Sequence, residues 1–147
     1  MKILIVGSGG REHAIAASVA KSPRADKIYC APGNAGIAEY AECVDIGAME
    51  FEKLAEFAKE KEIDLCIVGM DDPLVGGLVD VLEDAGIRTF GPKKNAAILE
   101  GSKAFSKDLM KKYDRELCIL KIGDCFLWIC KILISCRRNI VFFHKIF

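Results

Sequence analysis

The sequence lacks most of the short signatures that would assign a chemistry at once. Its 147 residues contain no G-x-x-x-x-G-K-[ST] loop, which excludes a Walker-type nucleotide site. Seven cysteines are present but none forms a C-x-x-C pair, so neither a zinc ribbon nor a dithiol redox motif is indicated. We therefore predict no metal site, and we expect the cysteines to be free thiols that are mostly buried.

An excess of charge of either sign is also missing. The formal net charge is zero, which gives no reason to expect nucleic acid as a partner. The first apolar run, residues 2–6, is too short for the core of a signal peptide. Residues 117–136 come nearest to a membrane span, but they contain Lys121, Asp124 and Lys131. Each of these charges would be energetically costly at the centre of a bilayer. We expect a cytoplasmic protein without a membrane or nucleic-acid partner.

Small residues and turn formers disappear towards the end of the chain. All four prolines, and every glycine except Gly123, lie at or before Tyr113. Residues 114–147 contain no alanine, are dense in Ile, Phe and Cys, and include the only Trp. The two parts, 1–113 and 114–147, therefore have to be interpreted separately.

Short apolar runs alternate with amphipathic segments over the first hundred residues. The pattern predicts strands and helices in turn, with strands at 2–6, 27–31, 43–46, 63–69 and 87–90, and helices at 11–21, 50–62, 73–85, 93–99 and 103–113. This alternation is typical of an α/β fold: a Rossmann-like open parallel sheet with helices on both faces. Ligands of such sheets bind beyond the carboxyl ends of the strands, which selects the loops 7–13, 32–36 and 69–75.

The loop GSGGREH, residues 7–13, resembles a dinucleotide fingerprint but departs from it twice. Gly7 and Gly9 match the first two glycines of G-x-G-x-x-G, whereas the third position is Glu12. We expect so large an acid to pack poorly there and to repel a pyrophosphate. The end of the second strand has Cys30, Ala31 and Pro32, without the acidic residue that would bind ribose hydroxyls. A nucleotide-dependent oxidoreductase is the least favoured function.

The same loop remains suitable for one phosphate. Amide groups of a glycine-rich turn at a helix start can bind a phosphate, helped by the helix dipole. Arg11 could add a charged fork, and Glu12 could accept hydrogen bonds from hydroxyls or an amine. An ordinary strand-to-helix turn with a solvated helix start is the alternative, and the residues alone leave both open. For His13 a packed or capping role is favoured over metal binding.

Four stretches carry a family resemblance: MKILIVGSGGREHAIA, APGNAG, IDLCIVGMDDPLVGGLVD and FGPKKNAAILEGSKAFSKDLM. In this order and spacing they resemble the amino-terminal part of the phosphoribosylamine–glycine ligases, or glycinamide ribonucleotide synthetases. The resemblance implies an ATP-dependent carbon–nitrogen ligase of de novo purine biosynthesis. It would join glycine, activated as an acyl phosphate, to phosphoribosylamine and release glycinamide ribonucleotide, ADP and phosphate, with ATP and Mg or Mn as cofactors.

The resemblance also implies a domain organisation. Residues 1–100 would form the pre-ATP-grasp domain and 101–113 the start of the ATP-grasp region. Residues 114–147 leave the family pattern, which usually continues G-I-P-T-A, and we interpret them as the product of a shifted reading frame or of a wrongly assembled gene. The ATP-grasp and carboxy-terminal domains would then be missing, with all catalytic and metal-binding residues. We expect the chain alone to be inactive and to bind no cofactor tightly.

The loops and the resemblance together predict a set of binding residues. For phosphoribosylamine these are Gly9, Gly10, Arg11, Glu12, Pro32, Gly33, Asn34, Asp71 and Pro73; for ATP it is Lys103. The family usually has Pro-Glu where this chain has Met70-Asp71, so the carboxylate is kept on a shorter side chain. A non-catalytic phosphoribosyl-binding module is the alternative to a ligase domain.

Overall fold

The structure is a computed structural model, and it describes residues 1–112. The chain divides into a compact unit, Met1–Gly101, and a second unit that begins at Ser102. Within the second unit the described part is the helix α6, Lys103–Lys112. The predictions for 114–147, including the shifted reading frame, lie outside the described residues. Among residues 1–112 no helix is both long enough and apolar enough to cross a bilayer.

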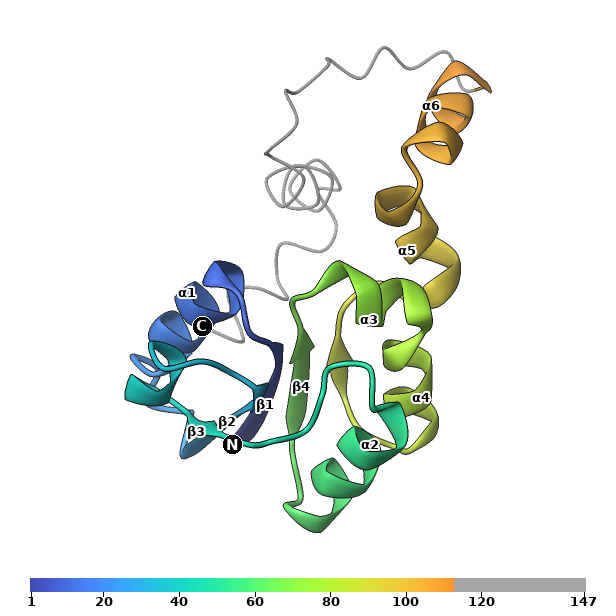
Figure 1. Cartoon of the computed structure of the whole chain (residues 1–147). Helices are drawn as coiled ribbons and strands as arrows, with labels where there is room; N and C mark the ends of the chain where they lie inside the picture. Colours follow the sequence, from blue (N-terminus) through green and yellow to red (C-terminus); the bar gives the residue numbers. More distant parts are fainter. Residues whose placement is uncertain (113–147) are drawn as a thin grey trace. The chain divides into compact units, whose positions relative to one another are not determined.

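A five-stranded parallel sheet forms the centre of the first unit (Figure 1). Its strands are β1 (Lys2–Gly7), β2 (Lys27–Pro32), β3 (Glu42–Cys43), β4 (Leu65–Val68) and β5 (Thr89–Phe90). They lie in the order β3-β2-β1-β4-β5, and every neighbouring pair is parallel. The predicted Rossmann-like α/β fold is confirmed, although β3 and β5 are two-residue strands and shorter than expected.

Helices cover both faces of this sheet. They are α1 (Gly10–Val19), the short 3-10 helix η1 (Ile37–Glu39), α2 (Phe51–Glu60), α3 (Asp71–Gly76), α4 (Leu78–Asp84) and α5 (Lys94–Gly101). Successive side chains of β1 enter two separate cores, because a strand presents alternate residues to opposite faces. Leu4 packs with Leu54 of α2 and Leu82 of α4. Ile5 packs on the other face with Ala16 of α1.

The predicted helix 73–85 differs from the structure, which divides it into α3 and α4. Gly77 separates them with a left-handed backbone, φ +98°, a conformation that favours glycine. Leu74 and Leu78 are buried on either side of the break and keep the spacing of one helix. The apolar pattern therefore continues through the break. In addition, α3 begins at Asp71, two residues before the proline that the sequence places at the helix start.

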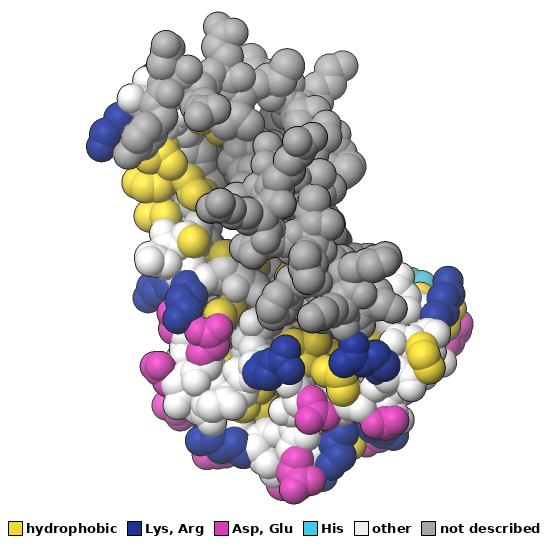
Figure 2. Space-filling model, turned by 180° about the vertical axis from the view of Figure 1, so that it is seen from behind, with side chains coloured by type: hydrophobic (Ala, Val, Ile, Leu, Met, Phe, Trp, Pro, Cys, Tyr) yellow, Lys and Arg dark blue, Asp and Glu magenta, His cyan; other side chains and the backbone are white. Residues whose placement is uncertain are grey.

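The sheet order places β1 between β2 and β4, so the chain leaves β1 towards one side and returns to its other side later. The carboxyl ends of β1 and β4 meet there, where Gly69 donates its amide hydrogen to Val6 O at 3.2 Å. Such switch points are where open α/β sheets bind ligands. On the face of the molecule seen in Figure 2, Lys and Arg side chains are interspersed with Asp and Glu side chains.

Candidate functional site

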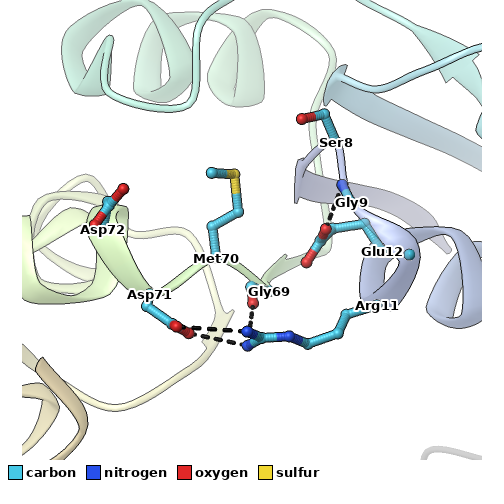
Figure 3. A pocket seen from close by; sticks show the side chains of 9 residues that line it. Ser8, Gly9, Arg11, Glu12, Gly69, Met70, Asp71 and Asp72 are labelled. Carbon is cyan, nitrogen blue, oxygen red and sulfur yellow. Dashed lines mark hydrogen bonds and ion pairs between the residues drawn. The ribbon is translucent and has the colours of Figure 1, made fainter. Parts of the chain in front are cut away.

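A cavity of about 290 Å³ lies between the β1–α1 turn and the β4–α3 loop (Figure 3). It is lined by Ser8, Gly9, Gly10, Arg11, Glu12, Gly69, Met70, Asp71 and Asp72. Two of the three loops that the strand order selects thus form it together. Four of the predicted binding residues in the first loop, and Asp71 in the second, are brought to one place.

The first turn of α1 forms one side of the cavity. Gly9 is the N-cap residue with an extended backbone, and α1 begins at Gly10. The first amide groups of a helix have no partner within the helix, so they can donate to an anion. A Cβ atom on Gly10 would meet no other atom within 4 Å, which shows that the space beside the turn is open.

Glu12 is buried in this turn, with 2% of its surface exposed. Its Oε2 accepts a hydrogen bond from Gly9 N at 2.7 Å, as the acidic residue of a capping box does. The side chain lies in space that two glycines leave. A Cβ atom on Gly7 would stand 2.6 Å from Glu12 Cγ, and one on Gly69 would stand 2.2 Å from Oε1. The expectation that a large acid packs poorly here is therefore wrong.

The two oxygens of Glu12 differ in their surroundings. Oε2 accepts the hydrogen bond from the Gly9 amide, whereas Oε1 lies beside Gly69, where an added Cβ atom would stand 2.2 Å from it. Because Glu12 lines the cavity, Oε1 is an acceptor for a donor that enters it. The acceptor role of Glu12 stays a prediction, and the turn holds the carboxylate in place through Oε2.

Arg11 and Asp71 join the two loops across the cavity. Arg11 Nη1 lies 2.9 Å from Asp71 Oδ1 and Nη2 lies 3.4 Å from Oδ2, as Figure 3 shows. Nη1 also donates to Gly69 O at 3.5 Å. The hydrogen bond to Asp71 raises the pKa of Arg11 above its ordinary value, against the opposing effect of burial, so the guanidinium stays charged. Sequence reasoning placed both residues at the site but missed their pairing.

Gly33 and Asn34 support the glycine turn from the neighbouring strand and do not line the cavity. Gly33 donates its amide hydrogen to Gly7 O at 3.1 Å. Asn34 donates from Nδ2 to Ser8 O at 2.7 Å and accepts the Ile37 amide through Oδ1 at 2.9 Å. Pro32 pairs with Gly7 at the end of the strands. Loop 32–36 therefore fixes the position of the turn.

The remaining predicted residues lie elsewhere. Pro73 is fully buried within α3 and does not line the cavity. Lys103 is exposed at the start of α6, in the second unit, and its ATP-binding role stays a prediction. His13 packs against Tyr40 with ring centroids 5.7 Å apart, as the packing interpretation predicts. Within residues 1–112 no group of three or more His, Cys, Asp or Glu is placed to hold a metal ion.

Cys30, Cys43 and Cys66 are free thiols, as expected, and two of them are buried. Burial raises the pKa of Cys30 to about 12, and burial alone does the same for Cys66. Neither thiol lines the cavity. They belong to the core and are not nucleophiles of the site.

Comparison with known proteins gives one consistent family. The family described as "Phosphoribosylglycinamide synthetase, N domain" matches residues 1–100. Phosphoribosylamine–glycine ligase of Caldanaerobacter subterraneus is 57% identical over 114 residues, and that of Agrobacterium fabrum is 54% identical. Each match covers 78% of this chain and 27% of the relative, so the chain spans about a quarter of the length of these proteins.

Solved structures agree on the fold. The crystal structure of phosphoribosylamine–glycine ligase from Thermotoga maritima matches 78% of this chain and 25% of its own, with a TM-score of 0.57 and 33% identity. The biotin carboxylase domain of a thermophilic 2-oxoglutarate carboxylase matches 76% of this chain and 27% of its own. Its TM-score is 0.59 but its identity is 20%, so this second likeness concerns the fold alone.

Proposed function

The chain belongs to the phosphoribosylglycinamide synthetase family through its N domain, and from this we propose that it is the phosphoribosylamine-binding part of an ATP-dependent ligase. The ligase joins glycine to 5-phosphoribosylamine and gives glycinamide ribonucleotide, ADP and phosphate in purine biosynthesis in the cytoplasm. We assign residues 1–100 to substrate binding and 101–113 to the beginning of the ATP-grasp region.

The observation that carries this proposal is the pairing of opposite chemistries in one cavity. The first-turn amides of α1 and the Arg11 guanidinium suit a phosphate. Glu12 Oε1 and the Asp71 carboxylate, which line the same cavity, suit hydroxyl or ammonium donors. A phosphorylated aminosugar presents both kinds of group within a few bonds of each other.

The size of the cavity supports a small ligand. Its volume of about 290 Å³ lies just below the usual range for small-molecule pockets. A pentose phosphate suits this volume better than a dinucleotide does. Glu12 fills the position where a dinucleotide fingerprint needs its third glycine, which points the same way.

The role of these residues is to bind and orient the sugar amine. A carboxylate beside the amine fixes its direction, and holding a reactant in one geometry lowers the entropic part of a barrier. ATP with Mg²⁺ or Mn²⁺ supplies the activation of glycine in the whole ligase. We place that step in the part of the relatives that this chain does not cover, since the match spans 27% of their length.

Calorimetric titration of the purified 147-residue chain with ribose 5-phosphate tests the proposal. Arg11→Ala is expected to weaken binding by about tenfold or more, because a charge-assisted hydrogen bond is lost. Lys27→Ala is the matched control, since it also removes a cation paired to a carboxylate but lies away from the cavity. Unchanged affinity in Arg11→Ala would remove Arg11 from the site, and no binding by the wild-type chain would contradict the proposal.

An assay with ribose 5-phosphate, ammonia, glycine and ATP separates binding from chemistry. We expect binding without formation of glycinamide ribonucleotide by this chain. Product formation would show that the chemistry does not need the remainder of the ligase. A non-catalytic phosphoribosyl-binding module, the second candidate, would give the same result here but would not restore activity when combined with the remaining domains of a relative.

A further inference from the structure

Arg11 is already engaged by a carboxylate at the place where the proposed phosphate has to bind. We propose that the Arg11–Asp71 ion pair is a latch: Asp71 holds the guanidinium while the site is free, and an entering phosphate takes its place. This inference rests on the proposed function, because it concerns the same cavity. Asp71 then has a second role, because it competes with an entering anion for the Arg11 guanidinium. An anion has to bind tightly enough to displace the Asp71 carboxylate.

The geometry of the pair makes Asp71 and a phosphate mutually exclusive. Asp71 uses both terminal nitrogens of Arg11, at 2.9 and 3.4 Å, and Gly69 O takes a further hydrogen of Nη1 at 3.5 Å. A phosphate binds a guanidinium through the same two parallel N–H groups. The outer edge of Arg11 therefore accepts one of the two anions at a time.

The pair is also exposed enough to open. The side chain of Arg11 is 47% exposed and that of Asp71 is 43% exposed. Ion pairs with this exposure contribute little net stability, because water solvates the separated partners almost as well. A phosphate dianion carries more charge than one carboxylate and also receives the first-turn amides of α1, so it is the stronger partner for Arg11.

Asp72 provides an internal control for this inference. It follows Asp71 directly, lines the same cavity and carries the same charge. In Figure 3 its carboxylate lies apart from Arg11, and no ion pair joins the two within the described residues. Removing either side-chain charge takes one negative charge from the lining of the cavity, but only removal of the Asp71 charge opens the latch.

The experiment measures the affinity of inorganic phosphate and of ribose 5-phosphate for the full chain by calorimetry. Asp71→Asn is expected to tighten phosphate binding by about two- to fivefold more than Asp72→Asn does, the range set by an exposed ion pair. In an Arg11→Gln background this difference between the two variants is expected to vanish. Both carboxamides keep the shape of the side chain, and thermal unfolding verifies that each variant folds.

Two results would overturn the latch. Equal effects of Asp71→Asn and Asp72→Asn would show that Asp71 acts through charge alone. Weaker binding of ribose 5-phosphate with unchanged phosphate binding in Asp71→Asn would make Asp71 an acceptor for the sugar. In either case ribose 5-phosphate binding by the wild-type chain leaves the proposed function intact. Absence of phosphate binding in every variant would overturn both proposals.

Discussion

At the carboxyl end of the sheet, the side chain of Glu12 fills the space that Gly69 leaves by having no side chain. A Cβ atom on Gly69 would stand 2.2 Å from Glu12 Oε1, a separation that real Cβ atoms do not adopt. Glu12 lies in the first turn of α1 and Gly69 in the loop after β4, so the carboxylate of one segment is seated in a gap of the other. This interlock fixes the direction of Oε1 towards the cavity and explains how a large side chain stands where a dinucleotide fingerprint needs glycine.

Gly69→Ala is therefore expected to destabilise the chain. The added methyl group displaces a buried side chain, and such overpacking costs about 1–3 kcal/mol in the free energy of unfolding. Urea denaturation followed by circular dichroism measures the change. Gly10→Ala serves as the control, because a Cβ atom there meets no other atom within 4 Å. Equal stability of Gly69→Ala and the wild type would show that Glu12 is not held in this gap.

Glu12→Gln is expected to separate the support of the turn from recognition of the ligand. The amide oxygen can still accept the Gly9 hydrogen bond, so the loss of stability is expected to be small. The atom that then faces the cavity is an NH₂ donor in place of an acceptor. We expect about a tenfold or greater loss of affinity for ribose 5-phosphate, from one charged hydrogen bond.

Inorganic phosphate is the matched ligand for Glu12→Gln. It has no sugar hydroxyls, so its affinity is expected to stay the same or to rise when a negative charge is removed. A parallel loss of affinity for both ligands would instead indicate that the turn itself has been disturbed. Glu12→Ala removes the acceptor of the Gly9 amide as well, and is expected to cost about 1 kcal/mol of stability.

The sequence alone predicts the fold well because its signals are local. Apolar runs such as residues 2–6 and 63–69 mark buried parallel strands, and the carboxyl ends of those strands select the loops that form the cavity. The break at Gly77 is missed, since the buried leucines on both sides keep helical spacing. A backbone torsion at one residue leaves no trace in that pattern.

The sequence predicts which residues form the candidate site, but it does not predict the contacts between them. Arg11, Glu12 and Asp71 are all found from the sequence, yet the pairing of Arg11 with Asp71 spans two loops far apart in the chain. The burial of Glu12 depends on the absent side chain of Gly69, which no local pattern records. Opposite charges on two loops that the sheet order brings together were the available signal for the ion pair.

Gly10→Ala is expected to preserve the fold and to impair the site. Alanine in a helix is more favourable than glycine by about 0.5–1 kcal/mol, so stability is expected to be maintained or to rise. The methyl group extends into the open space beside the first-turn amides, where the phosphate would lie. Calorimetry with inorganic phosphate is expected to show a clear loss of affinity, and Gly47→Ala, away from the cavity, no change.

The buried thiol of Cys66 is expected to make the free energy of unfolding depend on pH in the alkaline range. Burial raises the pKa of its thiol from 9.0 to about 12, so the folded chain keeps this proton where the unfolded chain has lost it. The contribution is fully present below pH 9 and is lost as the pH rises from 9 towards 12, at up to about 1.4 kcal/mol per pH unit.

Cys66→Ala removes the group, so its free energy of unfolding is expected to fall less steeply over this window than that of the wild type. Cys43→Ala, at an exposed thiol, is expected to keep the wild-type slope. Parallel curves for wild type and Cys66→Ala, measured by urea denaturation in the presence of a reductant, would show that the Cys66 thiol ionises alike in both states.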